Sequence, residues 1–211
     1  MARARIDPAG FPFVLGALAA ALIVGVGVAW WIAPPFLVLA GFFLFFFRDP
    51  ERRGSVDPRA VLSPADGRVL VGGPALPEAA PPGDWRQVSI FLSPMDVHVN
   101  RVPASGRVTR VTYTAGRFLP AYRHDAGAVN ERTEIWIDHD GQPIVARQVV
   151  GMLARRVVCR VETGARVQAG DRYGIMKFGS RMDVFVPITA EIRVKVGDTV
   201  RGGESVIAVL H

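Results

Sequence analysis

The chain contains a single cysteine, and Lys177 and Lys195 are its only lysines. One cysteine, Cys159, excludes an internal disulfide framework and a metal site built from several cysteines. Because it lies in an apolar run (156–161), we interpret Cys159 as a small buried side chain and not as a nucleophile. The sequence also lacks zinc-finger spacing, a glycine-rich phosphate loop and a basic run interleaved with aromatics. We therefore expect no metal, no bound nucleotide and no nucleic-acid partner.

Positive charge is carried almost entirely by arginine. Lysine and arginine together number 25 against 19 acidic residues, which gives a formal net charge of +6. A basic balance suits either nucleic acid or an anionic membrane surface, and the apolar N-terminal region favours the membrane. The planar guanidinium group can donate two hydrogen bonds to one phosphate. Genomic composition explains the arginine usage equally well.

Two apolar runs fill the first fifty residues. Phe11–Ile32 has no charged residue and would span about 33 Å as a helix, which is enough to cross a hydrocarbon core. Phe36–Phe47 follows a Pro-Pro turn and would span only about 18 Å, too short to cross alone. A cleaved signal peptide is the rival interpretation, but the first run is long for one and no A-x-A site follows. We predict that residues 1–50 form a membrane anchor.

Arginines flank this region on both sides, with Arg3 and Arg5 before it and Arg48, Arg52 and Arg53 after it. Positive charge marks the cytoplasmic side of a membrane segment. Both ends are therefore expected in the cytoplasm, joined by a hairpin or re-entrant pair. We predict a protein of the inner (cell) membrane whose body, residues 51–211, lies on the cytoplasmic side.

From Ser55 onwards the chain consists of short alternating apolar segments separated by Gly, Pro and Asp. Such spacing is typical of an antiparallel sandwich or barrel. Turns at 163–171 and 193–200 resemble the hairpins of biotinyl- and lipoyl-carrier domains. We predict a mainly β fold, a β-rich sandwich or hybrid barrel, with an N-terminal hydrophobic helical hairpin. Strands are expected at Arg68–Gly72, Gln87–Leu92, Arg107–Tyr113, Glu134–Ile137 and Arg155–Val161, and a strand or short helix at Ala146–Leu153.

The residues with reactive side chains lie in four segments of the body. Taken singly, each has an ordinary explanation. Asp66 before a glycine is a common turn former, and His98 in an apolar stretch is more often structural than catalytic. The Gly179-Ser180 pair alone is typical of a loop. The segments are Ser63–Val69, Ser93–Pro103, Asn130–Arg132 and Met176–Asp183.

Together these segments resemble the phosphatidylserine decarboxylase family, in its short, pyruvoyl-dependent bacterial and archaeal form. The resemblance runs from Arg48 to Leu210. Its most specific parts are Lys177-Phe-Gly-Ser-Arg-Met-Asp183 and Ser93-Pro-Met-Asp-Val-His-Val-Asn-Arg101. Two long motifs in the right order and at the right separation are too specific for a chance match.

The resemblance implies a proenzyme that cuts its own chain between Gly179 and Ser180. The Ser180 hydroxyl would attack the Gly179 carbonyl, and elimination and hydrolysis would leave a pyruvoyl group at position 180. A glycine before the serine leaves that carbonyl uncrowded and permits a strained backbone. The products would be a β chain, 1–179, and an α chain, 180–211, which form a heterodimer.

The family pattern assigns catalytic roles to Asp66 and His98 beside Ser180. Asp66 would orient a histidine that activates the Ser180 hydroxyl. The longer bacterial form carries two histidines three residues apart, and the later one belongs to its self-cleavage triad. This chain has His98, but Arg101 stands at the later position. Either His98 serves both self-cleavage and decarboxylation, or another group, with His124 as a candidate, starts the cleavage.

In turnover, the resemblance implies that the pyruvoyl carbonyl forms a Schiff base with phosphatidylserine in the membrane. His98 would protonate the carbanion after carbon dioxide leaves, and hydrolysis would give phosphatidylethanolamine. Arg101, Asn130 and Arg132 are candidate substrate-binding residues for the lipid phosphate or carboxylate, although structural ion pairs explain them about as well. We also expect a homo-oligomer.

Three other functions fit parts of the sequence. A membrane-tethered biotinyl- or lipoyl-like carrier would carry a modified Lys177, but it would leave His98 and Asp66 without a role. A pyruvoyl decarboxylase could act on a free amino acid or on another serine-headgroup lipid, and the predicted anchor argues against the former. A catalytically inactive membrane scaffold would not need the intact Gly179-Ser180 pair.

Overall fold

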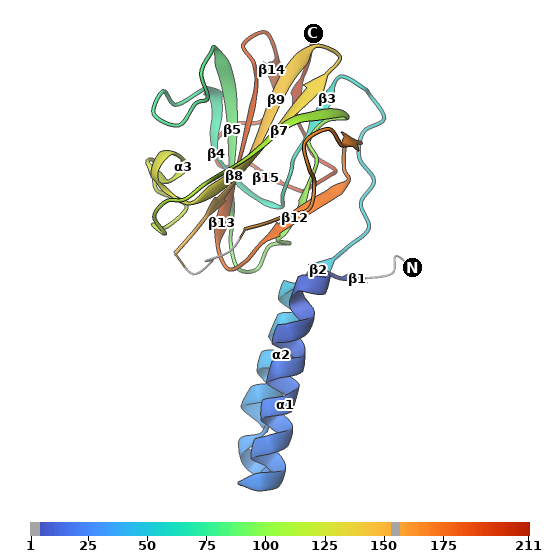
Figure 1. Ribbon diagram of the computed structural model, residues 1–211, viewed down its shortest axis with the longest axis vertical. Coiled ribbons are helices and arrows are strands. Elements are labelled where there is room, and N and C mark those ends of the chain that lie inside the picture. Colours follow the sequence, from blue (N-terminus) through green and yellow to red (C-terminus); the bar gives the residue numbers. More distant parts are fainter. Residues whose placement is uncertain (1–4, 153–156) are drawn as a thin grey trace. The chain divides into compact units, whose positions relative to one another are not determined.

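The computed structural model describes residues 5–152 and 157–211 (Figure 1). The chain divides into two compact units, Met1–Glu51 and Arg52–His211. The first is built from helices and the second almost entirely from strands, which confirms the mainly β fold with an N-terminal hydrophobic helical hairpin. The strand expected at Arg155–Val161 lies partly outside the described residues, and its remainder forms β10, Val157–Cys159.

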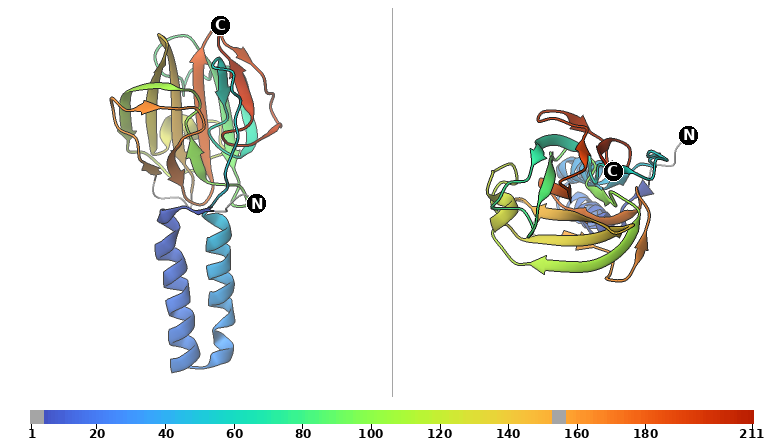
Figure 2. Two further views of the ribbon diagram at one scale, coloured as in Figure 1. Left: turned by 90° about the vertical axis from the view of Figure 1, so that its right-hand side faces the viewer. Right: turned by 90° about the horizontal axis from the view of Figure 1, so that it is seen from above.

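The first unit is a pair of apolar helices that lie side by side (Figure 2). Phenylalanine rings join them, since Phe13 lies 5.4 Å from Phe43 and 5.3 Å from Phe47 between ring centroids. Among the described residues, Pro8–Gly27 is the one helical stretch long and apolar enough to cross a membrane. The elements are β1 (Arg5–Ile6), η1 (Pro8–Gly10), α1 (Phe11–Gly27), η2 (Trp30–Ile32), α2 (Pro34–Phe46) and β2 (Arg48–Asp49).

The second unit is organised around an eight-stranded sheet in the order β11-β7-β8-β9-β13-β5-β4-β15. All neighbouring strands in it are antiparallel, and the sheet curls around an interior (Figure 2). The segment around Ala146 that could have been strand or helix is strand. The strands are β4 (Gly67–Pro74), β5 (Trp85–Leu92), β7 (Gly106–Thr114), β8 (Arg132–His139), β9 (Gln142–Val150), β11 (Arg166–Val167), β13 (Ser180–Pro187) and β15 (Thr199–Val200).

Two smaller antiparallel sheets and one short helix complete this unit. One sheet has the order β10-β12-β6, and its strands β12 and β6 bring the two specific sequence motifs together. The other has the order β14-β16-β3 and joins the chain's end to the start of the body. The remaining elements are β3 (Ala60–Leu62), β6 (Val99–Arg101), β10 (Val157–Cys159), β12 (Arg172–Met176), β14 (Glu191–Ile192), β16 (Val206–Val209) and α3 (Ala126–Val129).

Strand β13 is buried on both faces. Its even-numbered residues, such as Met182 and Val184, enter the main hydrophobic core. Its odd-numbered residues Arg181, Asp183 and Phe185 are also buried, on the opposite face, because side chains alternate along a strand. A strand held between two neighbours and covered on both faces is a rigid place for a reacting group.

Candidate active site

Ser180 is the first residue of β13 and is fully buried. Its backbone pairs with Leu92 of β5 on one side and Val150 of β9 on the other. Its hydroxyl oxygen, Oγ, has no hydrogen-bond partner among the described residues. A buried hydroxyl without a partner is costly, by about 1–3 kcal/mol, and such groups concentrate where a structure performs chemistry. The backbone of Ser180 is therefore fixed by the sheet, while its hydroxyl has no hydrogen-bond partner among the described residues, as a nucleophile needs.

The backbone just before Ser180 is held in an uncommon conformation. Phe178 has φ of 60° and Gly179 has φ of 74°, so two successive residues lie in the left-handed region. That region costs a non-glycine residue about 1–2 kcal/mol. Strain of this kind persists at sites where it has a use. Here the left-handed residues are Phe178 and Gly179, directly before Ser180.

Gly151 makes room for the carbonyl of the Gly179–Ser180 bond. A Cβ atom added at Gly151 would lie 2.0 Å from the Gly179 carbonyl oxygen, a distance that no two such atoms can share. Gly151 directly follows β9, whose last residue, Val150, pairs with Ser180. The sequence did not single out this glycine, because its closeness to Gly179 depends on the register of two strands far apart in the chain.

His98 is fully buried and faces the same bond. The backbone N–H of Gly179 donates to His98 Nε2 at 3.4 Å, and His98 Nδ1 lies 2.9 Å from the carbonyl oxygen of Asp96. A carbonyl can only accept, so Nδ1 carries the proton and Nε2 presents its lone pair to Gly179. The structure thus brings two of the predicted residues, His98 and Gly179, into contact, with Ser180 next in the chain.

Two buried amides that the sequence did not single out lie near these residues in the strand pattern. Asn100 is two residues after His98, and Gln148 is two residues before Val150, the partner of Ser180. Gln148 Nε2 donates to Asn100 Oδ1 at 2.8 Å. Asn100 Nδ2 and Gln148 Oε1 have no partner among the described residues. The pair therefore offers one free donor and one free acceptor inside the unit. Period-2 alternation from His98 is the sequence signal that could have found Asn100.

The resemblance implies that Asp66 orients a histidine, whereas the structure joins its carboxylate to Arg52 and Gly202. Its Oδ2 accepts from Arg52 Nη2 at 2.7 Å, and its Oδ1 accepts from the backbone N–H of Gly202 at 2.7 Å. Arg52 also pairs with Glu204 at 3.2 Å. Asp66 and Arg52 together therefore hold the turn at Gly202–Glu204 in place, within the segment that follows Ser180.

Arg101 lies next to the segment that carries Asp66. Its backbone N–H donates to the Pro64 carbonyl at 2.8 Å. Its side chain is buried, donates from Nη1 to the Gly170 carbonyl at 3.0 Å, and lies so close to Gly203 that an added Cβ there would come within 2.6 Å of its Cδ. Arg101 and Asp66 thus both contact the Gly202–Glu204 turn. An arginine keeps its proton and cannot serve as a base.

Asn130 and Arg132 are engaged with the protein backbone. Asn130 is fully buried and makes three hydrogen bonds, two with Leu119 and one with the Val150 carbonyl. It ties the segment after β7 to the end of β9, beside Ser180. Arg132 donates to the Ala128 carbonyl at 2.9 Å, and burial together with a nearby arginine lowers the pKa of its guanidinium. A substrate-binding role for either residue remains a prediction.

An apolar pocket of about 150 Å³ opens beside Gly179. It is lined by Phe91, Tyr122, Met152 and Phe178 together with two prolines and Ala121. The rings of Phe91 and Tyr122 meet edge to face, with centroids 5.9 Å apart. The pocket gives the Gly179–Ser180 region a route to the surface of the unit.

Arg181 links Ser180 to the segment that forms this pocket. Its Nε donates to Asp183 Oδ1 at 2.6 Å and its Nη2 donates to Ser89 Oγ at 3.0 Å, both buried. Its Nη1 donates to the Arg123 carbonyl at 3.3 Å, one residue after Tyr122. His124, the alternative candidate for the base, lines a second cavity of about 90 Å³ with Arg181 and Tyr122.

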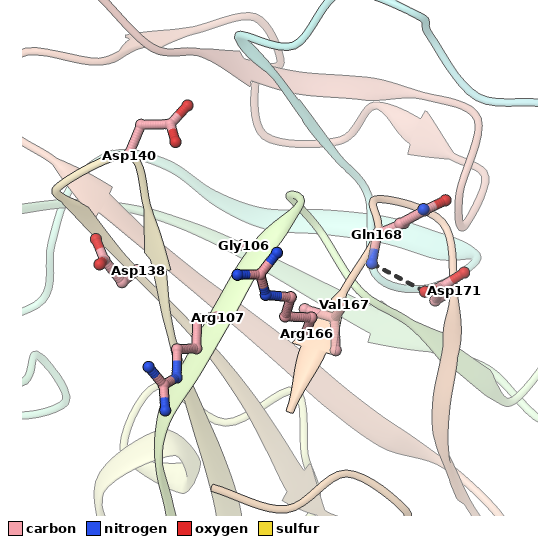
Figure 3. A pocket seen from close by; sticks show the side chains of 8 residues that line it. All are labelled: Gly106, Arg107, Asp138, Asp140, Arg166, Val167, Gln168 and Asp171. Carbon is pink, nitrogen blue, oxygen red and sulfur yellow. Dashed lines mark hydrogen bonds between the residues drawn. The ribbon is translucent and has the colours of Figure 1, made fainter. Parts of the chain in front are cut away.

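A wider hollow of about 600 Å³ lies elsewhere on the main sheet (Figure 3). Arg107 and Arg166 are paired across β7 and β11 there, and the aspartates Asp138 and Asp140 lie to one side. Its lining contains no histidine, serine or cysteine. It carries charges of both signs and lies apart from the motifs around His98 and Ser180.

Cys159 lies half-buried against the main core, and burial raises the pKa of its thiol. A thiol that holds its proton more tightly is a poorer nucleophile. The interpretation of Cys159 as a packing side chain agrees with this environment.

Comparison with protein families gives one match that covers most of the chain. The family model described as phosphatidylserine decarboxylase matches residues 39–208. The matched region contains the motifs around His98 and Ser180, the segment with Asp66, and most of α2.

Similar proteins come from several bacteria, and each is named phosphatidylserine decarboxylase proenzyme. The protein of Gluconacetobacter diazotrophicus is 44% identical, over 98% of this chain and 95% of its own. That of Nitrosomonas europaea is 40% identical, over 96% of this chain and 94% of its own. That of Chlorobium limicola is 40% identical, over 96% of this chain and 99% of its own.

The contact between Gly151 and Gly179 predicts the effect of one added methyl group. Gly151→Ala should displace the Gly179 carbonyl, because the new Cβ would lie 2.0 Å from its oxygen. We expect any cleavage at Gly179–Ser180 to slow by at least about tenfold, the effect of a misplacement near 1 Å in a reacting geometry. Intact mass measured over time after synthesis checks this. Gly41→Ala, with no atom within 4 Å of the new Cβ, is the matched control, and equal rates in the two variants would contradict the assignment.

The Arg52 ion pairs predict a loss of stability. Arg52→Gln should lower the free energy of unfolding by about 1–3 kcal/mol, because Asp66 and Glu204 lose a charged partner at a site only 10% exposed. Thermal unfolding of the detergent-solubilised chain measures this change. Arg53→Gln changes an exposed neighbour and should have little effect. An unfolding temperature equal to that of Arg53→Gln would show that the ion pairs do not stabilise the turn.

Proposed function

Because the chain belongs to the phosphatidylserine decarboxylase family, we propose that it cuts its own Gly179–Ser180 bond and then decarboxylates phosphatidylserine through a pyruvoyl group at position 180. One observation carries the proposal. A buried serine with an unpartnered hydroxyl follows two left-handed residues, and the lone pair of His98 faces the first of the two bonded residues at 3.4 Å. A nucleophile, a base and a strained backbone are the parts that self-cleavage needs.

Self-cleavage begins, in this proposal, with attack of Ser180 Oγ on the Gly179 carbonyl carbon. A new C–O bond forms while the Gly179–Ser180 C–N bond breaks, and the hydroxyl proton ends on the Ser180 nitrogen. His98 Nε2 carries that proton, because it holds a lone pair while Nδ1 donates to the Asp96 carbonyl. Elimination then releases the Gly179 carboxylate, and one water hydrolyses the remainder to ammonia and a ketone.

The residues around position 180 fit the pyruvoyl group. The Ser180 Cα and Cβ supply carbons from which it forms, the buried Ser180 Oγ without a partner among the described residues is the attacking atom, and His98 contacts the N–H of the neighbouring Gly179. When present, the group supplies a carbonyl that condenses with the substrate amine and takes up the electron pair released with carbon dioxide. His98 is then the buried side chain placed to move a proton near position 180, and the buried amides Asn100 and Gln148 can donate and accept hydrogen bonds there.

His98 is proposed to serve both self-cleavage and decarboxylation. Arg101 cannot act as a base, and its side chain contacts Gly170 and Gly203. The proposed role of Asp66 is to position the α chain through Gly202 and Arg52. The apolar pocket beside Gly179 is the proposed route by which the lipid headgroup reaches position 180.

The two chains are expected to remain together after cleavage. Ser180–His211 would keep β13 in the centre of the main sheet and β14, β15 and β16 in their sheets. We further propose that residues 1–50 anchor the protein in the inner membrane with the body on the cytoplasmic side. Pro8–Gly27 supports this by length and apolar character. Assembly of these heterodimers into a homo-oligomer remains a prediction.

Mass and activity of the purified full chain test the proposal. We expect two chains, one ending at Gly179 and one that begins with a pyruvoyl group and is therefore blocked to N-terminal sequencing. Ser180→Ala should remain full length and release no carbon dioxide from phosphatidylserine, because it lacks the attacking oxygen. An active protein that stays full length would refute the mechanism. Mass added at Lys177 without chain cleavage would favour the carrier function.

His98 is tested with Arg101 as its counterpart. His98→Ala should slow self-cleavage by about 100-fold or more, because it removes the base that contacts the Gly179 N–H. Arg101→His should still cleave, since His98 remains in place. Time-resolved intact mass measures both rates. Cleavage of His98→Ala at the wild-type rate would assign the base to another group, of which His124 is the first to test.

A further inference from the structure

Four large apolar side chains that the structure leaves exposed lie at one edge of the main sheet. The exposed fractions are 57% for Met95, 37% for Phe118, 63% for Tyr122 and 59% for Met152. Exposed apolar residues scattered singly need no explanation, whereas a contiguous group marks an interaction site. We name these four residues the apolar collar.

Strand register places the collar at the edge that holds the Gly179–Ser180 bond. Leu92, Ser180 and Val150 lie side by side across β5, β13 and β9. Met95 follows the end of β5, and Met152 follows the end of β9. Both therefore leave the sheet at the level of Ser180.

The other two collar residues reach the same edge through β7. This strand ends at Thr114, opposite the first residue of β8, and Arg132 of β8 pairs in turn with Val149. The segment after Thr114 carries Phe118 and Tyr122. Hydrogen bonds of Asn130 with Leu119 and the Val150 carbonyl fasten this segment beside the end of β9. Three separate loops thus contribute to one collar.

The collar surrounds the pocket that leads to Gly179. Tyr122 and Met152 line that pocket. Met95 directly follows the lining residue Pro94, and Phe118 precedes Leu119, the neighbour of the lining residue Pro120. The prolines Pro94 and Pro120 stiffen two of the loops. An apolar rim around an apolar pocket gives one continuous surface from solvent to the reacting bond.

Positive charge accompanies this surface. Arg117, next to Phe118, is exposed, and its charge helps to lower the pKa of Asp125. Arg123, next to Tyr122, is also exposed, and Asp125 binds it at 2.9 Å. Apolar side chains flanked by arginine are the composition of surfaces that bind anionic lipid interfaces.

We infer that the apolar collar inserts into the interface of a phospholipid membrane and delivers the lipid headgroup to the pocket. The inference rests on the proposed function, since a substrate embedded in a bilayer must enter the pocket from the membrane surface. A second copy of the chain on the collar would cover the pocket mouth and exclude the substrate. The lipid surface is therefore the occupant that leaves the site usable.

The first test compares a bilayer substrate with a monomeric one. Met95→Asp/Phe118→Asp places two charges in the collar at positions that do not line the pocket. We expect carbon dioxide release from phosphatidylserine liposomes to fall on the order of tenfold, because a charge resists entry into the interface. Release from a water-soluble short-chain phosphatidylserine, below its critical micelle concentration, should match that of the unchanged chain.

Ile188→Asp is the matched control. Ile188 is 51% exposed and follows the far end of β13, about 25 Å along the strand from Ser180. It should leave both activities unchanged. Equal liposome activity in the collar variant and this control would overturn the inference, and so would equal losses on both substrates, which would indicate damage to the site itself.

The second test reads insertion without activity. Met95→Cys in a Cys159→Ala chain is labelled with a small fluorophore, and the full chain is reconstituted in liposomes that contain brominated phosphatidylcholine and phosphatidylserine. We expect the bromines to quench this label strongly and the same label at Ile188→Cys weakly. Equal quenching at the two positions overturns the inference, as does a collar label that is shielded from iodide yet not quenched by lipid, which would place a second copy there.

These two tests separate the inference from the proposed function. If the unchanged chain releases no carbon dioxide from either substrate, the proposed function fails while the quenching result still decides whether the collar inserts. Quenching at the collar with normal decarboxylation supports both. Normal decarboxylation without quenching refutes the collar alone.

Discussion

The backbone register that joins Ser180 to Leu92 and Val150 is the constraint on which the site depends. Because Ser180 begins the central strand, its amide and carbonyl belong to a ladder that the whole sheet maintains, while Gly179 just before it is outside that ladder and left-handed. The Gly179–Ser180 bond therefore stands at the point where a rigid strand meets a strained turn. The proposed cut at this bond would relieve the turn and leave the strand in place.

The outer face of β13 would keep position 180 fixed if the proposed cleavage made it a chain end. Arg181 is buried and bound to Asp183 and Ser89, and it also holds the backbone of the pocket segment at Arg123. A buried arginine is costly unless its donors are satisfied. Here the satisfied donors connect the residue next to the reacting one with the wall of the pocket, so the two cannot move independently.

The sequence predicted the mainly β fold class from its short alternating apolar segments, and the two long motifs singled out His98 and Gly179, which the structure brings into contact. It could not predict that Asp66 binds Arg52 and Gly202, since that depends on how a turn more than a hundred residues away returns to the body. The role of Gly151 was hidden for the same reason: only the paired ends of β9 and β13 bring it against Gly179. Local pattern reveals alternation and turns, whereas register between distant strands is fixed by packing of the whole core.

Arg101 stands where the resemblance to the longer bacterial form implies a second histidine. The segments that carry Asp66 and Arg101 are joined by a backbone hydrogen bond, so a histidine at position 101 would also lie near the turn that Asp66 binds. An arginine there carries a permanent charge, and it is stabilised by the Gly170 carbonyl and by close packing on Gly203. It thereby takes over structural support of the segment after Ser180 and cannot exchange a proton. The lone pair near Gly179 is then left to His98, whose tautomer is set by the Asp96 carbonyl. In the proposed mechanism, one buried imidazole with a fixed tautomer would accept the serine proton once and, in a processed chain, return protons at the same position in every later turnover.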